Sequence, residues 1–154
     1  MNKLSLADLQ TIRFKFSKIT TDEFAVLEEY YDAEIPVNVN VGLLFNFVKE
    51  EKLIGAGVKC SFFQKEKVVI VIALTCWFKV DEDDWKSVYD QTNKQYMLSR
   101  PPALHLASLT IGTVRGVLHA KTENQALNVV ILPPINVNEI IKEDVSVKEA
   151  IVQT

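Results

Sequence analysis

The residues best suited to chemistry are few in this sequence, and their spacing keeps them apart. The two histidines, His105 and His119, fall in one predicted helix, which separates them by about 21 Å along its axis. They cannot share a metal ion or a proton relay within one subunit. Cys60 and Cys76 lie in strand-like runs without a second Cys or His at metal-ligand spacing. We therefore expect two buried free thiols and no bound metal.

A run of carboxylates, Asp81-Glu82-Asp83-Asp84, suggests a cation site but lacks the spacing and the glycine of a calcium-binding loop. We interpret this run as a solvated turn that ends a sheet. The sequence also lacks a nucleophile elbow, a phosphate-binding loop and a dinucleotide fingerprint. These observations predict a protein that is not an enzyme and uses no cofactor.

Length and composition indicate one globular domain over residues 1–154, of which 48% are hydrophobic and 24% charged. The formal net charge of -3 gives no electrostatic footprint for nucleic acid or an anionic membrane. The first residues do not resemble a secretory signal, and the longest apolar run, residues 68–74, is too short to span a bilayer. We expect a cytoplasmic protein without a membrane span.

The first two-thirds of the chain alternates apolar and polar residues, which is typical of strands with one face on a core. Four runs show the alternation: residues 12–16, 37–47, 54–62 and 68–80. A polar stretch at residues 20–23 interrupts the first strand, and residues 24–27 are a possible continuation of it. Because short charged turns join the last three runs, consecutive strands must pair antiparallel. The pattern predicts a four-stranded antiparallel meander.

The last third of the chain predicts helices. A short helical or irregular link at residues 85–98 leads to a proline-led start, and residues 103 to about 120 carry an apolar stripe at helical spacing. Residues 127–132 are extended, Pro133-Pro134 breaks them, and a second short helix begins within residues 135–141. The predicted fold class is α+β: a four-stranded antiparallel meander followed by a long helix and a short C-terminal helix.

The fourth predicted strand is apolar on both faces. Its outward residues, Val69, Val71, Ala73, Thr75 and Trp77, are nearly as apolar as the inward ones. A strand buried on one side should alternate, so the second face of the sheet requires a cover. The sequence leaves open whether the terminal segment, a second subunit or a bound polypeptide provides it.

The long helix carries small residues at every fourth position: Ser108, Gly112, Gly116 and Ala120. Each helical glycine costs roughly 1 kcal/mol relative to alanine, which suggests that another backbone approaches this stripe closely. Either a sheet surface or a second copy of the same helix fits. We predict that the stripe is an interface between subunits.

The element order and several motifs resemble those of the SecB export-chaperone family of bacteria. The motif positions are Phe78, Pro102, Leu104, Ala107, Leu109, Val114, Arg115-Gly116 and residues 131–137. The chain departs from the family pattern at Ala103 and His105, near the helix start, and at Val137. Element order extends the resemblance over most of the chain.

The resemblance implies a homotetramer, a dimer of dimers with the long helices at the subunit interfaces. Unfolded polypeptide would bind apolar grooves on its outside without ATP or metal. Some relatives act in protein transport and dock a translocase ATPase through an acidic sheet face, while others control toxin–antitoxin systems. Arg13 and Lys15 make the first strand basic here, which weakens the export interpretation, and the partner stays open between a translocase and an antitoxin.

The leading hypothesis is therefore an ATP-independent chaperone, or holdase, for non-native polypeptides. Its predicted peptide-binding residues on the outward sheet face are Leu44, Phe63, Val69, Val71 and Trp77. Those of the terminal segment, which would form the opposite wall, are Ile135, Val137 and Ile140. A small-ligand enzyme of the hot-dog type is an alternative, although its long helix should precede most strands. A structural assembly subunit is the third.

Overall fold

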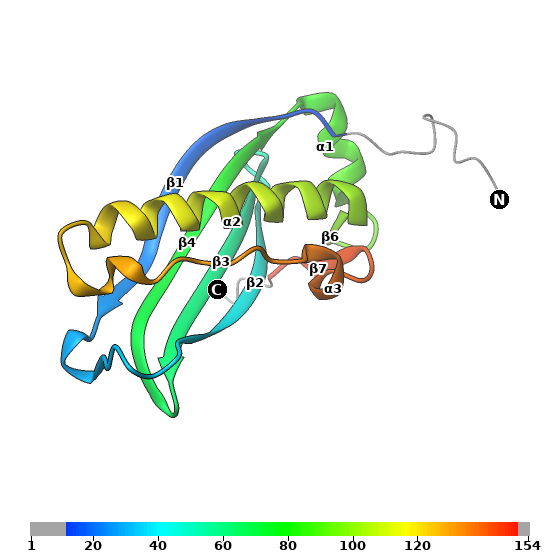
Figure 1. Ribbon diagram of the computed structural model, residues 1–154. Coiled ribbons are helices and arrows are strands. Elements are labelled where there is room, and N and C mark those ends of the chain that lie inside the picture. The colour runs from blue at the N-terminus through cyan, green and yellow to red at the C-terminus, as the bar shows by residue number, and fades with distance from the viewer. Residues whose placement is uncertain (1–11, 151–154) are drawn as a thin grey trace.

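The computed structural model describes residues 12–150 and confirms the α+β class (Figure 1). The chain runs through β1 (Phe14–Val26), a 3₁₀ helix (Glu28–Tyr30), β2 (Asn38–Val48), β3 (Leu53–Gln64), β4 (Lys67–Val80), α1 (Glu82–Val88), β5 (Tyr89–Asp90), β6 (Gln95–Leu98), α2 (Arg100–Thr122), a second 3₁₀ helix (Ala126–Val129), α3 (Val137–Ile140) and β7 (Val145–Lys148). The long helix and the short helix after it confirm the predicted order.

The main sheet is antiparallel and four-stranded, but it is not a simple meander. Its order is β1-β4-β3-β2, so β2 to β4 form the meander while β1 lies beside β4. Tight turns force β2, β3 and β4 to be neighbours. The connection from β1 to β2 is longer and contains a 3₁₀ helix, so it can cross the end of the sheet. The result is a Greek-key arrangement rather than the predicted meander.

β1 is one continuous strand, which corrects the predicted interruption at residues 20–23. Its pairing with β4 shifts register between Phe16 and Lys18 and again between Thr21 and Glu23. Each bulge adds one residue to β1 and allows the strand to bend along its twisted neighbour. Polar side chains are tolerated there because β1 is an edge strand with exposed positions.

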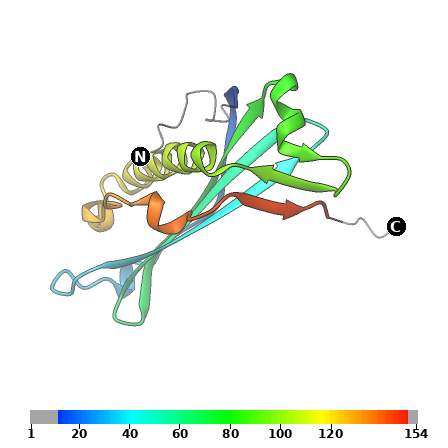
Figure 2. The ribbon, with the colours of Figure 1, turned by 90° about the vertical axis from the view of Figure 1, so that its right-hand side faces the viewer.

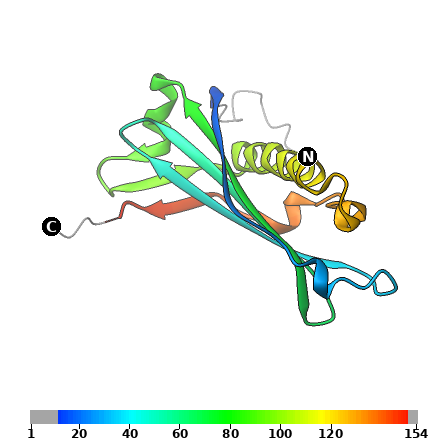
Figure 3. The same ribbon diagram turned by 90° about the vertical axis from the view of Figure 1, so that its left-hand side faces the viewer.

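The core lies between one face of the main sheet, called the inner face, and α2. Alternate residues of β4 from Ile70 to Val80 are at most 1% exposed, and α2 packs on β3 and β4 through Leu106, Ile111 and Val114. Figures 2 and 3 show α2 and the segment that follows it on the same side of the sheet. The opposite side, called the outer face, is therefore not covered by this part of the terminal segment.

α2 spans Arg100–Thr122, slightly more than the predicted 103–120. Pro101 and Pro102 lie in its first turn, where a missing N–H has no helical partner to lose. Arg100 also fixes the later chain, because its Nε donates to the Ile141 carbonyl at 2.8 Å and its backbone N–H donates to Asp144 at 2.7 Å. The first turn of α2 thus anchors the terminal segment.

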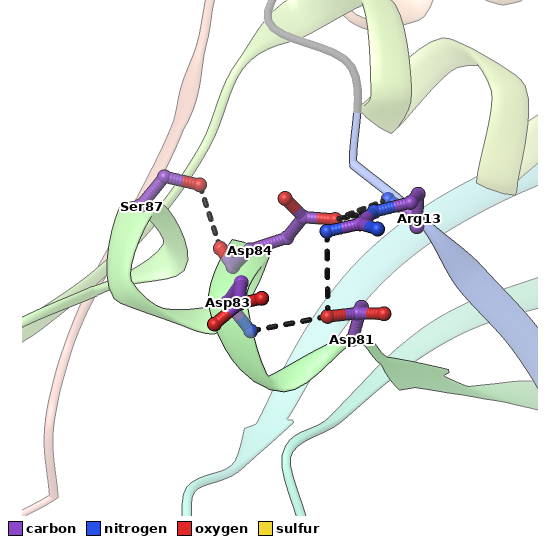
Figure 4. Close-up of polar contacts among 5 residues, drawn as sticks. All are labelled: Arg13, Asp81, Asp83, Asp84 and Ser87. Atoms are coloured by element: carbon purple, nitrogen blue, oxygen red, sulfur yellow. Dashed lines mark hydrogen bonds and ion pairs between the residues drawn. The ribbon is translucent and has the colours of Figure 1, made fainter.

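The acidic run is the start of a helix rather than the predicted turn. Asp81 caps α1 by accepting a bond from the Asp83 backbone N–H, and Asp84 accepts from Arg13 Nε at 3.0 Å (Figure 4). Arg13 holds the pKa of Asp84 below its ordinary value through hydrogen bonds from its backbone and its side chain. This cluster ties the chain before β1 to α1.

Sequence periodicity did not predict the second, three-stranded sheet, β5-β6-β7. Its strands have only two or four residues, too few to show an alternation. The sheet packs beside β2 through Tyr96, whose ring stacks on Phe47 at 4.8 Å between centroids. Lys49 Nζ pairs with Glu149 at 2.7 Å and ties the C-terminal strand to the β2–β3 turn.

The two cysteines are buried and free, as predicted. Cys60 pairs with Ile72 on β4, four residues before Cys76, which confirms the expected register. At the rise of a strand this offset is about 13 Å, too far for a disulfide. Burial raises the pKa of the Cys60 thiol to about 11.

Candidate functional site

An apolar groove crosses the outer face of the main sheet. Strand register aligns Trp77 with Gly55, and Thr75 with Gly57 and Leu44. The absence of side chains at the glycines leaves a hollow of about 460 Å³ between Leu44, which is 64% exposed, and the indole of Trp77. This outer groove is lined by Asp22, Gly42, Leu43, Leu44, Asn46, Gly57, Val58, Lys59, Ala73, Leu74, Thr75 and Trp77.

The indole of Trp77 is held in place by its neighbours. Its Nε1–H donates to Thr20 Oγ1 at 3.1 Å. A Cβ at Gly55 would lie 2.8 Å from the ring, so only glycine allows the indole to lie over β3. Lys18 Nζ lies 5.5 Å from the ring centroid, within the range of a cation–π contact. The wall of the outer groove is therefore pre-organised.

The polar atom in the floor of the outer groove is satisfied within the protein. Thr75 is 5% exposed, and its hydroxyl donates to Asp22 at 2.7 Å. Asp22 reaches this position because it is the extra residue of the second bulge in β1. An occupant would thus meet a floor that requires no new hydrogen bond.

A second groove, lined mainly by residues of apolar type, lies on the side of the sheet that carries α2, next to the edge strand β2. It has a volume of about 360 Å³. We call it the edge groove, and its lining residues are Tyr31, Val37, Val39, Phe62, Val129, Val130, Ile131 and Pro133.

One wall of the edge groove begins at Val129, the last residue of the second 3₁₀ helix, and continues as extended chain, so the predicted extended run from residue 127 starts later than expected; its side chains alternate in exposure. Val129 and Ile131 are 70% and 65% exposed, whereas Val130 and Leu132 are 7% and 1% exposed. Arg115 fixes this segment to α2, since its Nε and one Nη donate to the Leu132 and Pro133 carbonyls at 2.8 and 3.0 Å. A rigid row of apolar side chains is thereby left in solvent.

The other wall is built by β2 and the chain before it. Gln64 is 4% exposed, accepts a bond from the Asp32 N–H and donates to the Asp32 and Ile35 carbonyls. These bonds hold the loop that carries Tyr31 and Val37. Within residues 12–150, β2 pairs only with β3, so its second edge has no strand partner.

The predicted residues of the outer face are divided by the structure. Leu44 and Trp77 line the outer groove, and Phe63 and Val71 are half-buried nearby on the same face. Val69 is 0% exposed and belongs to the core, so its predicted exposure is wrong. The register shift between Phe62 and Phe63 leaves Val69 as an extra residue, which interrupts the assumed alternation.

The terminal residues do not form an opposite wall for the outer groove. Val137 is half-buried and lines a hollow beside Leu104 and Leu109 of α2, on the other side of the sheet. Ile135 is also half-buried, and Ile140 is 41% exposed. The predicted single groove is therefore wrong, and two separate grooves exist. Val129 and Ile131 were missed, although four consecutive apolar residues before Pro133-Pro134 are a usable signal.

The small-residue stripe lies on the exposed side of α2. The four residues, Ser108, Gly112, Gly116 and Ala120, are exposed. A Cβ at either glycine would meet nothing within 4 Å. Of the two predicted partners, a sheet surface of the same chain is thus excluded for the described residues.

Among residues 12–150, no group of three or more His, Cys, Asp or Glu side chains is placed to hold a metal ion. No helix in the same range is both long and apolar enough to cross a membrane. No protein-family model matches the chain, and no curated protein matches it either.

Proposed function

We propose that the chain is an ATP-independent chaperone that holds non-native polypeptides in the edge groove. The observation that carries the proposal is the pair of exposed apolar side chains, Val129 and Ile131, fixed beside an edge of β2 that has no strand partner in the described part of the chain. Covering these two side chains with an apolar partner would be favourable, because it removes their surface from water.

The edge groove suits clients of many sequences. Contact with apolar side chains is non-directional and contributes roughly 25 cal/mol per Å² buried. An extended client can also pair with β2, because backbone hydrogen bonds read no side chains. Pockets for alternate side chains between Val39 and Ile131 would favour clients rich in apolar residues.

We further propose that four copies assemble as a dimer of dimers through α2. Gly112 and Gly116 leave open space on the exposed side of this helix, so a second helix can approach closely. The half-buried Leu104 and Leu109 would supply apolar contact next to the stripe. Ile131 lies on the segment after α2 and not on the helix itself, so assembly through the stripe would leave the edge groove accessible.

We propose that the chain works in the bacterial cytoplasm and binds and releases its clients without a cofactor or a metal ion.

Suppression of aggregation tests the proposal. A chemically denatured, unrelated enzyme is diluted into buffer without nucleotide, and light scattering is followed with and without the chain. We expect scattering to fall as the chain approaches a stoichiometric amount. Unchanged scattering at a molar excess would contradict holdase function, and in an intact oligomer it would favour the structural-subunit alternative.

A further inference from the structure

Two lysines on the outer face stand directly opposite each other. Register pairs Lys15 of β1 with Lys79 of β4, and both side chains are exposed. Like charges directly across a pair of strands are destabilising. Within residues 12–150 neither lysine forms an ion pair with a carboxylate; Lys79 donates only to the Glu51 carbonyl. The repulsion between the two lysines is partly offset within the fold, because Asp81 and Glu82 line the same hollow as the pair.

The carboxylates of the same face are already engaged. Glu23 pairs with Lys59 at 2.9 Å, and Asp22 accepts the bond from Thr75. Lys18 lies beside Trp77. On β1 it is the next residue after Lys15 that points to the outer face. Three lysines that form no ion pair within residues 12–150 therefore lie beside or beyond Trp77 on the outer face, and two of them, Lys15 and Lys79, line a hollow next to the outer groove.

We infer that the outer groove docks a partner segment carrying carboxylates beside an apolar side chain. The carboxylates would neutralise Lys15 and Lys79. The apolar side chain would enter the hollow between Leu44 and Trp77. Lys79 is two residues beyond Trp77, about 7 Å along the strand, so neighbouring residues of one extended segment can reach both features.

The outer groove differs from the edge groove in the kind of polypeptide segment that it would bind. Lysines lie beyond Trp77, next to the outer groove, so charge would select which segments bind there. The docking site goes beyond client holding, because its occupant is a defined acidic segment rather than any non-native chain.

Peptide binding tests the inference in the full chain. The probes are a fluorescent peptide in which Glu flanks a central Leu, and a matched peptide with Lys in place of Glu. We expect the acidic peptide to bind, to weaken with added salt, and to shift the Trp77 indole N–H resonance while leaving buried Trp85 unchanged. Equal binding of the two peptides would overturn the charge selection.

Charge-reversal variants test whether Lys15 and Lys79 bind the acidic peptide. Lys15→Glu with Lys79→Glu keeps a like-charge pair in the sheet but removes the Lys79 bond to the Glu51 carbonyl and places the new carboxylates near Asp81 and Glu82, so circular dichroism and urea unfolding first check that the variant folds. We expect at least about tenfold weaker binding of the acidic peptide. The control, Lys142→Glu with Lys148→Glu, makes the same change in net charge at exposed positions elsewhere and should leave binding within about twofold. Equal losses in both variants would contradict a local site.

Filling the hollow tests the apolar contact. Gly42 has a negative φ, and a Cβ added there would meet no atom within 4 Å, so Gly42→Leu should fold and occupy the outer groove. We expect acidic-peptide binding to be lost while suppression of aggregation is kept. Unchanged peptide binding would remove the groove from the site. If this variant instead loses aggregation suppression and keeps peptide binding, both assignments of the grooves are wrong.

Discussion

The outer groove and the edge groove are both apolar hollows, but they are made in different ways. The outer groove lies on regular strands, and its shape comes from glycines and the fixed indole of Trp77. One wall of the edge groove is the irregular chain after α2, held by the burial of Val130 and Leu132 and by the carbonyls that Arg115 binds. The outer groove offers apolar side chains with lysines nearby. The edge groove offers apolar side chains beside an edge of β2 that has no strand partner within residues 12–150.

This difference shows that exposed apolar area alone does not define a class of ligand. Leu44 and Ile131 are exposed to nearly the same extent, at 64% and 65%. Their surroundings differ, because Leu44 lies across the outer groove from Trp77, with lysines beyond the indole, whereas Ile131 lies across the edge groove from β2. Charge favours a particular partner, whereas backbone pairing accepts many sequences.

The largest expected effect comes from charging the edge groove. Val129→Asp with Ile131→Asp should abolish suppression of aggregation, because a client would have to bury two carboxylates. The unfolding free energy should change by no more than about 0.5 kcal/mol, since both side chains are exposed. Met97→Asp with Val147→Asp is the matched control, because it charges two exposed apolar residues of the small sheet. An equal loss of holding in the control would mean that the edge groove has no special role.

Assembly should depend on α2 and on neither groove. Gly112→Leu fills the open space on the helix, and we expect it to hold the partner backbone away and dissociate the oligomer. Sedimentation velocity at micromolar concentration measures the state. Gly42→Leu introduces the same side chain into the outer groove and should leave assembly intact. A wild-type chain that sediments as a 17.4 kDa monomer would refute assembly.

A smaller effect is expected from Gly55→Ala, which disturbs the outer groove alone. The added methyl group would meet the Trp77 ring at 2.8 Å and displace the indole. We expect a loss of about 1–3 kcal/mol in the free energy of unfolding, with aggregation suppression kept. Gly42→Ala, which meets no neighbour, should be nearly neutral. Equal stabilities for the two variants would show that Trp77 does not depend on Gly55.

The smallest expected effect is the pH dependence of stability that comes from Cys60, in the core behind both grooves. The pKa of the Cys60 thiol is about 11 in the folded chain against an ordinary 9.0, so the folded state retains its proton longer. Stability from this thiol is complete below about pH 9 and is lost as pH rises toward 11. Wild type should lose on the order of 1–2 kcal/mol more than Cys60→Ala over this window, measured by urea unfolding. Parallel pH profiles would contradict the raised pKa.

Periodicity was enough to predict the strands of the meander and the long helix. It could not place β1, because a long connection permits either neighbour, whereas tight turns permit only one. Val69 was misplaced by a bulge that no residue type announces. The predicted Leu44 and Trp77 share the outer groove because regular alternation fixes their face. The edge groove was missed because it depends on contacts between Arg115 and carbonyls 17 and 18 residues later.

Site-specific photo-crosslinking tests the central claim most directly. A photoreactive residue is placed at Ile131 in one variant and at Leu44 in another, and each is mixed with a chemically denatured, radiolabelled client. Because the two native side chains are equally exposed, chance collisions should label both positions alike. We expect the client to crosslink at position 131 several-fold more than at position 44. Equal crosslinking, or a preference for position 44, would contradict client binding in the edge groove.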